Sequence, residues 1–250
     1  RRLPEKRGAL TEPASRQTVQ RPSSSVQRPA SIIPHPSSSV QRTMPPLLQL
    51  TGVSAGYDHR HLVFEGFSLT LEHGQVACLH GPSGTGKTTA LLVAAGLLRP
   101  RQGAVRRTTR RLAFVFQDDC LLPWRNARDN IIFTLARKFS RTEAGERADF
   151  WLERFGLGPH RQKMPGDLSG GMRRRVNIAR ALAGDPELLF LDEALSFLDA
   201  AMAERCLLAM ADWQRGVNGG ILAVTHDLAQ LQTLAPTVIA WPPTPGPSTE

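Results

Sequence analysis

Short apolar runs alternate with stretches of helical periodicity along most of this chain. Residues 67–71 (FSLTL) alternate between apolar and polar, which predicts an antiparallel, half-exposed strand. Apolar runs of strand length lie at residues 47–53, 75–80, 112–116, 188–191, 221–224 and 237–241. The runs at 75–80 and 112–116 indicate buried strands. Helices are predicted at residues 87–98, 127–155 (two helices, the second at 141–155), 170–183, 199–214 and 228–234, with a loop at 156–166. This alternation predicts an α/β fold with a parallel sheet, whose functional residues lie at the carboxyl ends of the strands.

One connecting stretch, residues 99–111, is short and basic. We interpret it as a solvated hairpin edge, where positive charge discourages pairing with another chain. A patch that contacts DNA is the alternative, but the stretch has no interleaved aromatic residues.

Composition and charge narrow the picture. The 250 residues could hold one large domain or two small ones, and a hydrophobic content of 41% is enough for a sizeable core. Residues 1–43 hold eight Lys or Arg and two Glu, so they contribute +6 of the formal net charge of +9. Because most of the excess charge belongs to this tail, the high overall pI is weak evidence for a nucleic-acid partner.

The N-terminal tail, residues 1–45, is poor in apolar residues and rich in Pro, Ser, Arg and Gln. Such a composition predicts disorder, because too little apolar surface is available to offset the entropy of ordering. Within it, residues 22–28 (PSSSVQR) recur as residues 36–42. The tail is either a basic tether for a membrane surface or RNA, or translated upstream sequence, since the first methionine is Met44. We favour the second interpretation and expect residues 1–43 to be dispensable; the Pro-rich end, residues 242–250, is expected to fray.

The sequence predicts a soluble, intracellular protein. No apolar run approaches the length of a membrane helix, and the N-terminal region has no apolar signal segment. The cysteines Cys78, Cys120 and Cys206 are far apart and lack metal or redox spacing. Isolated reduced thiols are therefore favoured over a structural disulfide or a zinc site.

The most informative stretch is a phosphate loop between the apolar run at 75–80 and the helix predicted after it. It consists of Gly81, Pro82, Ser83, Gly84, Thr85, Gly86, Lys87 and Thr88, followed by Thr89. Glycines let successive backbone N–H groups turn inward, and the helix N-terminus adds positive potential. Lys87 can then reach the β- and γ-phosphates of a nucleotide, and the hydroxyl of Thr88 can bind Mg²⁺. Because Lys, Thr and the strand–helix context agree, a Gly-rich turn without function is disfavoured.

Other polar groups follow the predicted strands. Gln117 follows the run at 112–116, Asp192 and Glu193 follow the run at 188–191, and His226 follows the run at 221–224. Asp192 is suited to hold Mg²⁺ directly or through water, and Glu193 is free to polarise an attacking water. A strand-end cap is the alternative for the Asp-Glu pair, and the upstream phosphate loop counts against it.

With these residues in place, residues 47–241 resemble the nucleotide-binding subunit of ATP-binding cassette (ABC) transporters. The most specific resemblance is Leu168-Ser169-Gly170-Gly171-Met172, which is similar to the family signature and precedes Asp192 at the usual spacing. The resemblance implies that Tyr57 stacks on adenine, Gln117 senses Mg²⁺ and water, and His226 contacts the γ-phosphate. It also implies that Ser196-Phe197-Leu198-Asp199 forms the loop that links opposed active sites.

The resemblance implies a phosphate-loop NTPase (RecA-like) core with a parallel sheet, a small antiparallel β subdomain and a helical subdomain at about residues 118–170. The whole nucleotide-binding domain would span residues 46–241. It further implies an ATPase that uses ATP and Mg²⁺ and pairs head to tail with a second copy. Ser169, Gly170 and Gly171 open a predicted helix, and such a helix start favours anions. In the family this site contacts ATP bound to the other protomer, so dimerisation depends on ATP and is undone by hydrolysis, and the binding energy of the γ-phosphate drives a domain closure.

Some positions depart from the family pattern without removing a residue that has a proposed chemical role. Met172 and Arg174 stand on the signature helix where Gln is common. Ala194 replaces the usual Pro after Glu193, and Phe197 replaces a usual small residue in the linking loop, where it could alter dimer packing. We therefore expect an active ATPase.

The segment after Gln117 indicates which kind of protein the chain docks to. Its pattern, LLPWRN…DN within residues 121–130, is similar to bacterial importers of nitrate, sulfonate, taurine and related compounds. Leu121, Leu122 and Trp124, if exposed together, suit a docking groove for a helix of a membrane permease. The alternative is that they pack under the helical subdomain, which is favoured for Leu121. The resemblance implies integral-membrane permease subunits and, indirectly, a periplasmic substrate-binding protein as partners, at the cytoplasmic face of the inner membrane.

Two other functions fit the sequence less well. A soluble cassette ATPase acting on nucleic acid, in repair or translation, usually carries a long coiled-coil insert or two cassettes, and this sequence shows neither; no nucleic-acid partner is expected. A non-catalytic interaction protein is disfavoured by the intact Glu193 and His226.

Overall fold

A computed structural model of the chain describes residues 44–58 and 61–243. The predictions for residues 1–43, including the repeat, and for residues 244–250 fall outside these ranges and stay predictions. Among the residues that the structure describes, no helix combines the length and apolar character needed to cross a membrane.

The first sheet is antiparallel and has three strands, β1 (Leu48–Ala55), β2 (Phe64–Leu71) and β4 (Gln102–Arg107), in the order β2-β1-β4. The predicted antiparallel, half-exposed strand is therefore confirmed, as part of β2, which pairs with β1 through Leu48 and Leu71. The basic stretch at 99–111 contains β4, an edge strand whose side chains are mostly exposed.

The second sheet is parallel and contains the strands that carry the predicted site. It has the order β5-β6-β7-β3-β8. Its strands are β5 (Leu112–Val115), β6 (Leu188–Asp192), β7 (Gly220–Val224), β3 (Val76–His80) and β8 (Thr237–Ala240). The prediction that 112–116 is a buried strand was wrong in part: Leu112, Ala113 and Phe114 are half-buried, because β5 is an edge strand with a neighbour on one side only.

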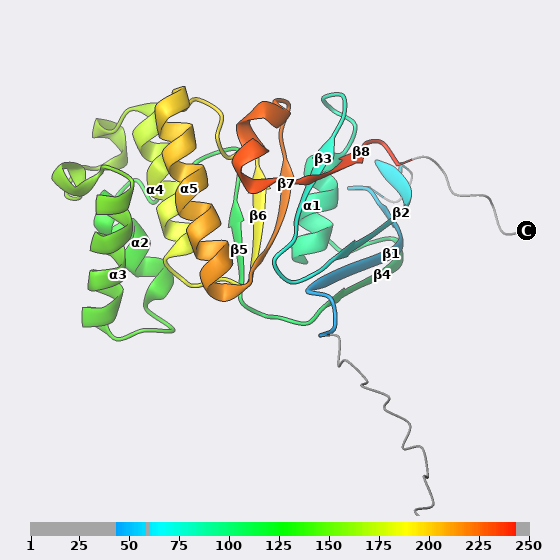
Figure 1. Cartoon of the computed structure of the whole chain (residues 1–250), viewed down its shortest axis with the longest axis horizontal. Helices are drawn as coiled ribbons and strands as arrows, with labels where there is room; N and C mark the ends of the chain where they lie inside the picture. The colour runs from blue at the N-terminus through cyan, green and yellow to red at the C-terminus, as the bar shows by residue number, and fades with distance from the viewer. Residues whose placement is uncertain (1–43, 59–60, 244–250) are drawn as a thin grey trace, which may run out of the picture. The chain divides into compact units, whose positions relative to one another are not determined.

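Helices cover both faces of the parallel sheet. They are α1 (Lys87–Ala95), α2 (Ala127–Leu135), α3 (Arg141–Arg154), α4 (Gly170–Leu182) and α5 (Ala200–Val217). Figure 1 shows α1 between the two sheets, whereas α2 to α5 lie on the opposite face of the parallel sheet. Residues 228–234, predicted as a helix, form a 3₁₀-helix, and the loop at 156–166 contains two 3₁₀ turns, Gly158–His160 and Pro165–Asp167.

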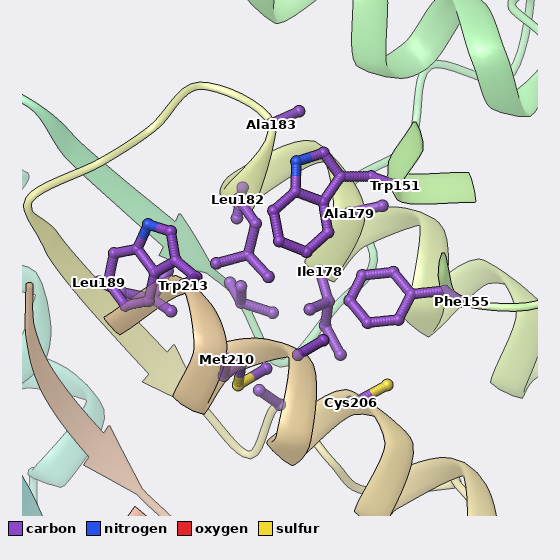
Figure 2. Packing of buried hydrophobic residues seen from close by; sticks show 14 of the residues in the cluster. Trp151, Phe155, Ile178, Ala179, Leu182, Ala183, Leu189, Cys206, Met210 and Trp213 are labelled. Carbon is purple, nitrogen blue, oxygen red and sulfur yellow. The ribbon is translucent and has the colours of Figure 1, made fainter. Parts of the chain in front are cut away.

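The helical face has a large aromatic core. Trp151 and Phe155 from α3 and its end, Ile178 from α4, and Met210 and Trp213 from α5 pack together, as Figure 2 shows. All five side chains are less than about one-tenth exposed, so each removes most of its apolar surface from water. This core joins the helices to the parallel sheet through Leu189 of β6.

Side-chain caps fix where the helices begin. Ser140 and Glu143 form a capping box at the start of α3, in which each accepts from the other's backbone N–H. Ser169 caps α4 and Asp199 caps α5, and each accepts from the backbone N–H three residues later. Since a cap of this kind stabilises a helix by about 1 kcal/mol, these two candidate site residues also contribute to the fold.

The cysteines are free thiols. Cys78 and Cys206 are buried and Cys120 is exposed. Burial raises the pKa of the Cys78 thiol to about 11 and that of Cys206 to about 12, so both are protonated at neutral pH.

Candidate active site

The phosphate loop follows β3 and can be built only with glycine at two positions. A Cβ on Gly81 would lie 1.9 Å from the carbonyl oxygen of Trp241. Gly86 has a φ of 96°, and a Cβ there would lie 2.4 Å from Cγ1 of Val63. The indole N–H of Trp241 also donates to the carbonyl of Thr85 at 2.8 Å, so the end of β8 holds the loop in shape.

Lys87 begins α1 and closes the loop. Its ammonium donates to the carbonyl oxygens of Gly81 at 2.8 Å and Pro82 at 2.5 Å, and the residue is only 5% exposed. Thr85 donates its hydroxyl to the carbonyl of Pro82 at 2.7 Å. The positive charge is therefore fixed against the backbone that would surround a phosphate group.

A pocket of about 600 Å³ opens over the loop. It brings together the groups predicted at the ends of three strands with the loop and Tyr57. Its lining comprises Tyr57, Val63, Ser83, Gly84, Gly86, Lys87, Thr88, Thr89, Gln117, Asp192, Glu193, Ser196, Phe197, Val224 and His226. This volume is within the usual range of sites for small molecules and cofactors.

Tyr57 is exposed at this pocket and is anchored at one end. Its ring is accessible, with 64% of the residue exposed, and its hydroxyl shares a hydrogen bond of 3.2 Å with that of Thr89. An exposed aromatic ring held at its polar tip can present a flat face to a planar ring such as adenine.

Thr88 and Asp192 form an oxygen pair beneath the pocket. The hydroxyl of Thr88 donates to Oδ1 of Asp192 at 3.1 Å, and Asp192 is 2% exposed at the tip of β6. Burial raises the pKa of the Asp192 carboxyl, with the nearby Glu193 charge acting in the same direction and the Thr88 hydrogen bond opposing it.

This pair fits the chemistry of Mg²⁺. The described ranges 44–58 and 61–243 contain no group of three or more His, Cys, Asp or Glu side chains that could hold a metal by themselves. Mg²⁺ in nucleotide sites commonly uses one or two carboxylates together with water and substrate phosphates, so it does not require such a group. Thr88 and Asp192 supply oxygen ligands of the required kind beside the phosphate loop.

Glu193 and His226 meet across the carboxyl ends of β6 and β7. Oε1 of Glu193 lies 3.1 Å from Nε2 of His226, and the same nitrogen lies 3.3 Å from the hydroxyl of Ser83. Glu193 has a φ of 48°, and its amide donates to the carbonyl of Val224 at 3.0 Å. A left-handed conformation at a residue other than glycine costs free energy, and here it directs the carboxylate into the pocket beside His226.

The two signature glycines, Gly170 and Gly171, line a different pocket of the same chain. Ser169 accepts from the backbone N–H of Met172 at 3.3 Å, and neither Ser169 nor Gly170 is buried. A pocket of about 420 Å³ is lined by Gln117, Asp118, Asp119, Gly170, Gly171, Arg173, Arg174 and Phe197. Ser169, Gly170, Gly171 and Asp199 are not among the residues that line the pocket over the phosphate loop.

Phe197 stands between the two pockets and lines both of them. It has a φ of 68° and is 82% exposed. An aromatic side chain this exposed in a left-handed backbone conformation buries little of its apolar surface within the chain. Phe197, which stands where the resembled family usually has a small residue, therefore places a large ring at the mouth of both pockets.

The segment after Gln117 differs from its prediction. Trp124 is 70% exposed, but Leu121 and Leu122 are half-buried, and Leu121 packs against the main core. The expectation that all three are exposed together was wrong, and the alternative of packing holds for Leu121. The buried Asn130 folds the segment inward. Its side chain accepts from the backbone N–H of Leu122 at 2.7 Å and donates to the carbonyl of Arg125 at 2.9 Å.

Val63 and Trp241 carried no functional signal by themselves in the sequence, and Arg174 stood out only as a departure from the family pattern. Val63 precedes β2, Trp241 follows β8, and Arg174 lies within α4. Their contacts with Gly86, the loop carbonyls and the Gln117 segment link positions far apart along the chain. Only an alignment could have detected them before the fold was known.

Comparisons with known proteins agree with this geometry. The family model described as ABC transporter matches residues 64–196. The chain is 39% identical over 210 residues to the taurine import ATP-binding protein TauB of Mesorhizobium japonicum, which covers 80% of this chain and 82% of that protein. It is 35% identical over 210 residues to the nitrate transport protein NasD of Klebsiella oxytoca, covering 78% and 80%. A dimeric ATP-binding cassette in a post-hydrolysis state with ADP and Pi superposes with a TM-score of 0.71 at 26% identity, covering 77% of this chain and 93% of that one.

Proposed function

Since this chain belongs to the ABC transporter family and is an ATPase of that family, we propose that its ATP hydrolysis powers a bacterial importer of nitrate, a sulfonate, taurine or a similar small compound. The observation that carries the proposal is the single pocket in which Lys87, the Thr88–Asp192 pair and the Glu193–His226 pair all meet. The relatives are a taurine import ATP-binding protein and a nitrate transport protein, and they support the substrate class for this chain.

Each part of the pocket has a proposed role in ATP hydrolysis. The loop N–H groups and Lys87 bind the β- and γ-phosphates, and Tyr57 stacks on adenine. Thr88, Asp192 and Gln117 hold Mg²⁺, which when bound offsets the negative charge of the phosphates. Glu193 polarises the attacking water, and His226, which bridges Glu193 and Ser83, contacts the γ-phosphate.

A second copy of the chain completes the site. Ser169, Gly170 and Gly171 open α4, where N–H groups face a pocket that is separate from the phosphate loop of the same chain. We assign them to ATP bound by a partner subunit, with Asp199 in the loop that links the two sites. The dimeric cassette with ADP and Pi supports a dimer for this chain.

The other partners are integral-membrane permease subunits and, through them, a periplasmic substrate-binding protein. This assignment places the chain at the cytoplasmic face of the inner membrane. ATPase activity measured with permease vesicles and with DNA tests it: stimulation by permease vesicles supports the importer, whereas stimulation by DNA alone supports a nucleic-acid ATPase and contradicts it.

Trp124→Ala is expected to weaken recovery of the chain with its permease and to uncouple ATP hydrolysis from uptake. Trp124 is an exposed aromatic beside Arg125 and Arg128, and truncating such an anchor in an interface costs about 2–4 kcal/mol, or roughly 30- to 700-fold in affinity. Co-purification with the permease and substrate uptake into vesicles measure the effect, while ATP binding by the isolated chain should stay near normal.

Leu208→Ala provides a matched control, because Leu208 is also exposed and apolar but lies on α5, outside residues 117–128. It should co-purify and support uptake like the unaltered chain. Full uptake and normal recovery by the Trp124 variant would contradict docking through this segment.

A further inference from the structure

Arginines of α4 hold the backbone of the segment at residues 116–120. Arg174 donates from Nη1 to the carbonyl of Phe116 at 2.7 Å and from Nη2 to the carbonyl of Gln117. Arg180 donates to the carbonyls of Cys120 at 2.8 Å and Asp119 at 3.1 Å. The helix that begins with the signature thus binds nearly every carbonyl of the segment that contains Gln117.

The arginines hold this segment where the sheet no longer does. β5 ends at Val115, so the carbonyls that follow lie beyond the strand, and Cys120 adopts a φ of 46°. Each of these carbonyls can accept a hydrogen bond from a donor outside the sheet. A guanidinium presents several N–H groups in a planar fork and can bind two neighbouring carbonyls at once.

Arg174 is also fixed by charge. It is 2% exposed, and its Nε lies 3.6 Å from Oδ1 of Asp119, while Nε of Arg173 lies 3.3 Å from Oδ2 of the same carboxylate. Asp119 lines the pocket that contains Gly170 and Gly171. The two arginines therefore neutralise a carboxylate that would repel an anion at the start of α4.

We infer that Arg174 is a positioning residue that sets the place of Gln117 by tying the backbone of the Gln117 segment to the signature helix. Gln117 lines both pockets, and Arg174 holds its carbonyl and leaves its side chain free for a ligand. Gln, the commoner residue of the resembled family at this position, ends in one nitrogen and cannot offer two nitrogens to two carbonyls. The inference rests on the proposed function in that Gln117 is proposed to bind Mg²⁺.

If Arg174 positions Gln117, replacing Arg174 should change the Mg²⁺ dependence of the ATPase and the exchange of nearby amides, but not ATP binding without Mg²⁺. ATP binding without Mg²⁺ depends on the phosphate loop and Lys87, which Arg174 does not contact, so it should stay within about twofold. The Mg²⁺ concentration needed for half-maximal ATPase activity should rise about tenfold, because Gln117 is no longer held at the pocket. Backbone amides at residues 116–122 should exchange hydrogen at least about tenfold faster.

Arg174→Gln and Arg174→Lys test the inference in the full chain. ATP affinity in EDTA, the Mg²⁺ dependence of the ATPase and hydrogen exchange at 116–122 are the readouts. Lys keeps the charge beside Asp119 but loses the two-nitrogen fork. Hydrogen exchange at 116–122 should therefore be as fast in the Lys variant as in the Gln variant. The Mg²⁺ concentration for half-maximal ATPase activity should rise in the Lys variant too, but less than in the Gln variant. Arg174→Lys also provides a second variant if the Gln variant does not fold.

Arg175→Gln is the matched control. Arg175 is the next residue of α4, but it donates to the carbonyl of Phe155 at 2.8 Å and not to the Gln117 segment. It should alter thermal stability without changing exchange at 116–122 or the Mg²⁺ dependence. The inference is overturned if both Arg174 variants match the unaltered chain, or if Arg175→Gln reproduces their effects. A chain that neither binds nor hydrolyses ATP would overturn the proposed function instead, and the exchange measurement would still test the contact.

Discussion

Glu193→Gln is expected to lower the rate of ATP hydrolysis roughly 10²- to 10⁴-fold, the range for loss of a general base, while ATP binding stays near normal. The Glu193 carboxylate lies 3.1 Å from His226 at the pocket, where it can polarise water beside the γ-phosphate. Gln has nearly the same shape but cannot accept a proton. Single-turnover hydrolysis and ATP affinity measure the two effects separately.

The same variant should accumulate as an ATP-bound dimer. Hydrolysis undoes the proposed dimer, so blocking it traps two nucleotides between two copies, each held by a phosphate loop and the signature residues Ser169 to Gly171 of the other copy. Gel filtration with and without MgATP reports the shift in size. A variant that hydrolyses ATP normally contradicts the role of Glu193, and one that stays monomeric with its permease present contradicts the shared site.

Glu187→Gln is the matched control. Glu187 stands just before β6, at the opposite end of the strand from Glu193, and its carboxylate pairs with Arg111. Its loss changes a salt bridge with Arg111 and leaves the pocket intact. Hydrolysis should therefore stay near normal.

Lys87→Ala should weaken ATP binding roughly 10²- to 10⁴-fold, because each hydrogen bond from a charged group contributes about 1.5–3 kcal/mol and Lys87 is placed to reach two phosphates. Its ammonium is held against the carbonyls of Gly81 and Pro82, and the residue is 5% exposed. Calorimetry with ATP measures the loss.

Lys138→Ala separates this effect from a general loss of stability. Lys138 also donates from its ammonium to a backbone carbonyl, that of Gly184 at 2.6 Å, but it does not line the pocket over the phosphate loop. It should bind ATP normally. Unchanged ATP affinity in the Lys87 variant, or an equal loss in both variants, would contradict the assignment of the phosphate loop.

The sequence by itself determined the features that depend on neighbours along the chain. The phosphate loop at residues 81–88 was predicted because its glycines, Lys87 and Thr88 are contiguous and follow a strand. The parallel sheet was predicted because apolar runs alternate with helical periodicity, and the placement of Asp192, Glu193 and His226 at one sheet edge follows from that alternation. Local pattern is sufficient here, since both hydrogen bonding within an element and its apolar face are set by adjacent residues.

The tertiary structure alone decided the features that depend on residues distant in sequence. Leu112 to Phe114 are half-buried because β5 lies at a sheet edge, and strand order cannot be read from an apolar run. The bridge from Ser83 through His226 to Glu193 joins three separate elements. The sequence marked Arg174 only as a departure from the family pattern on the signature helix, yet it is buried against carbonyls 57 and 58 residues earlier in the chain. Such contacts are set by how whole elements pack, which no local pattern encodes.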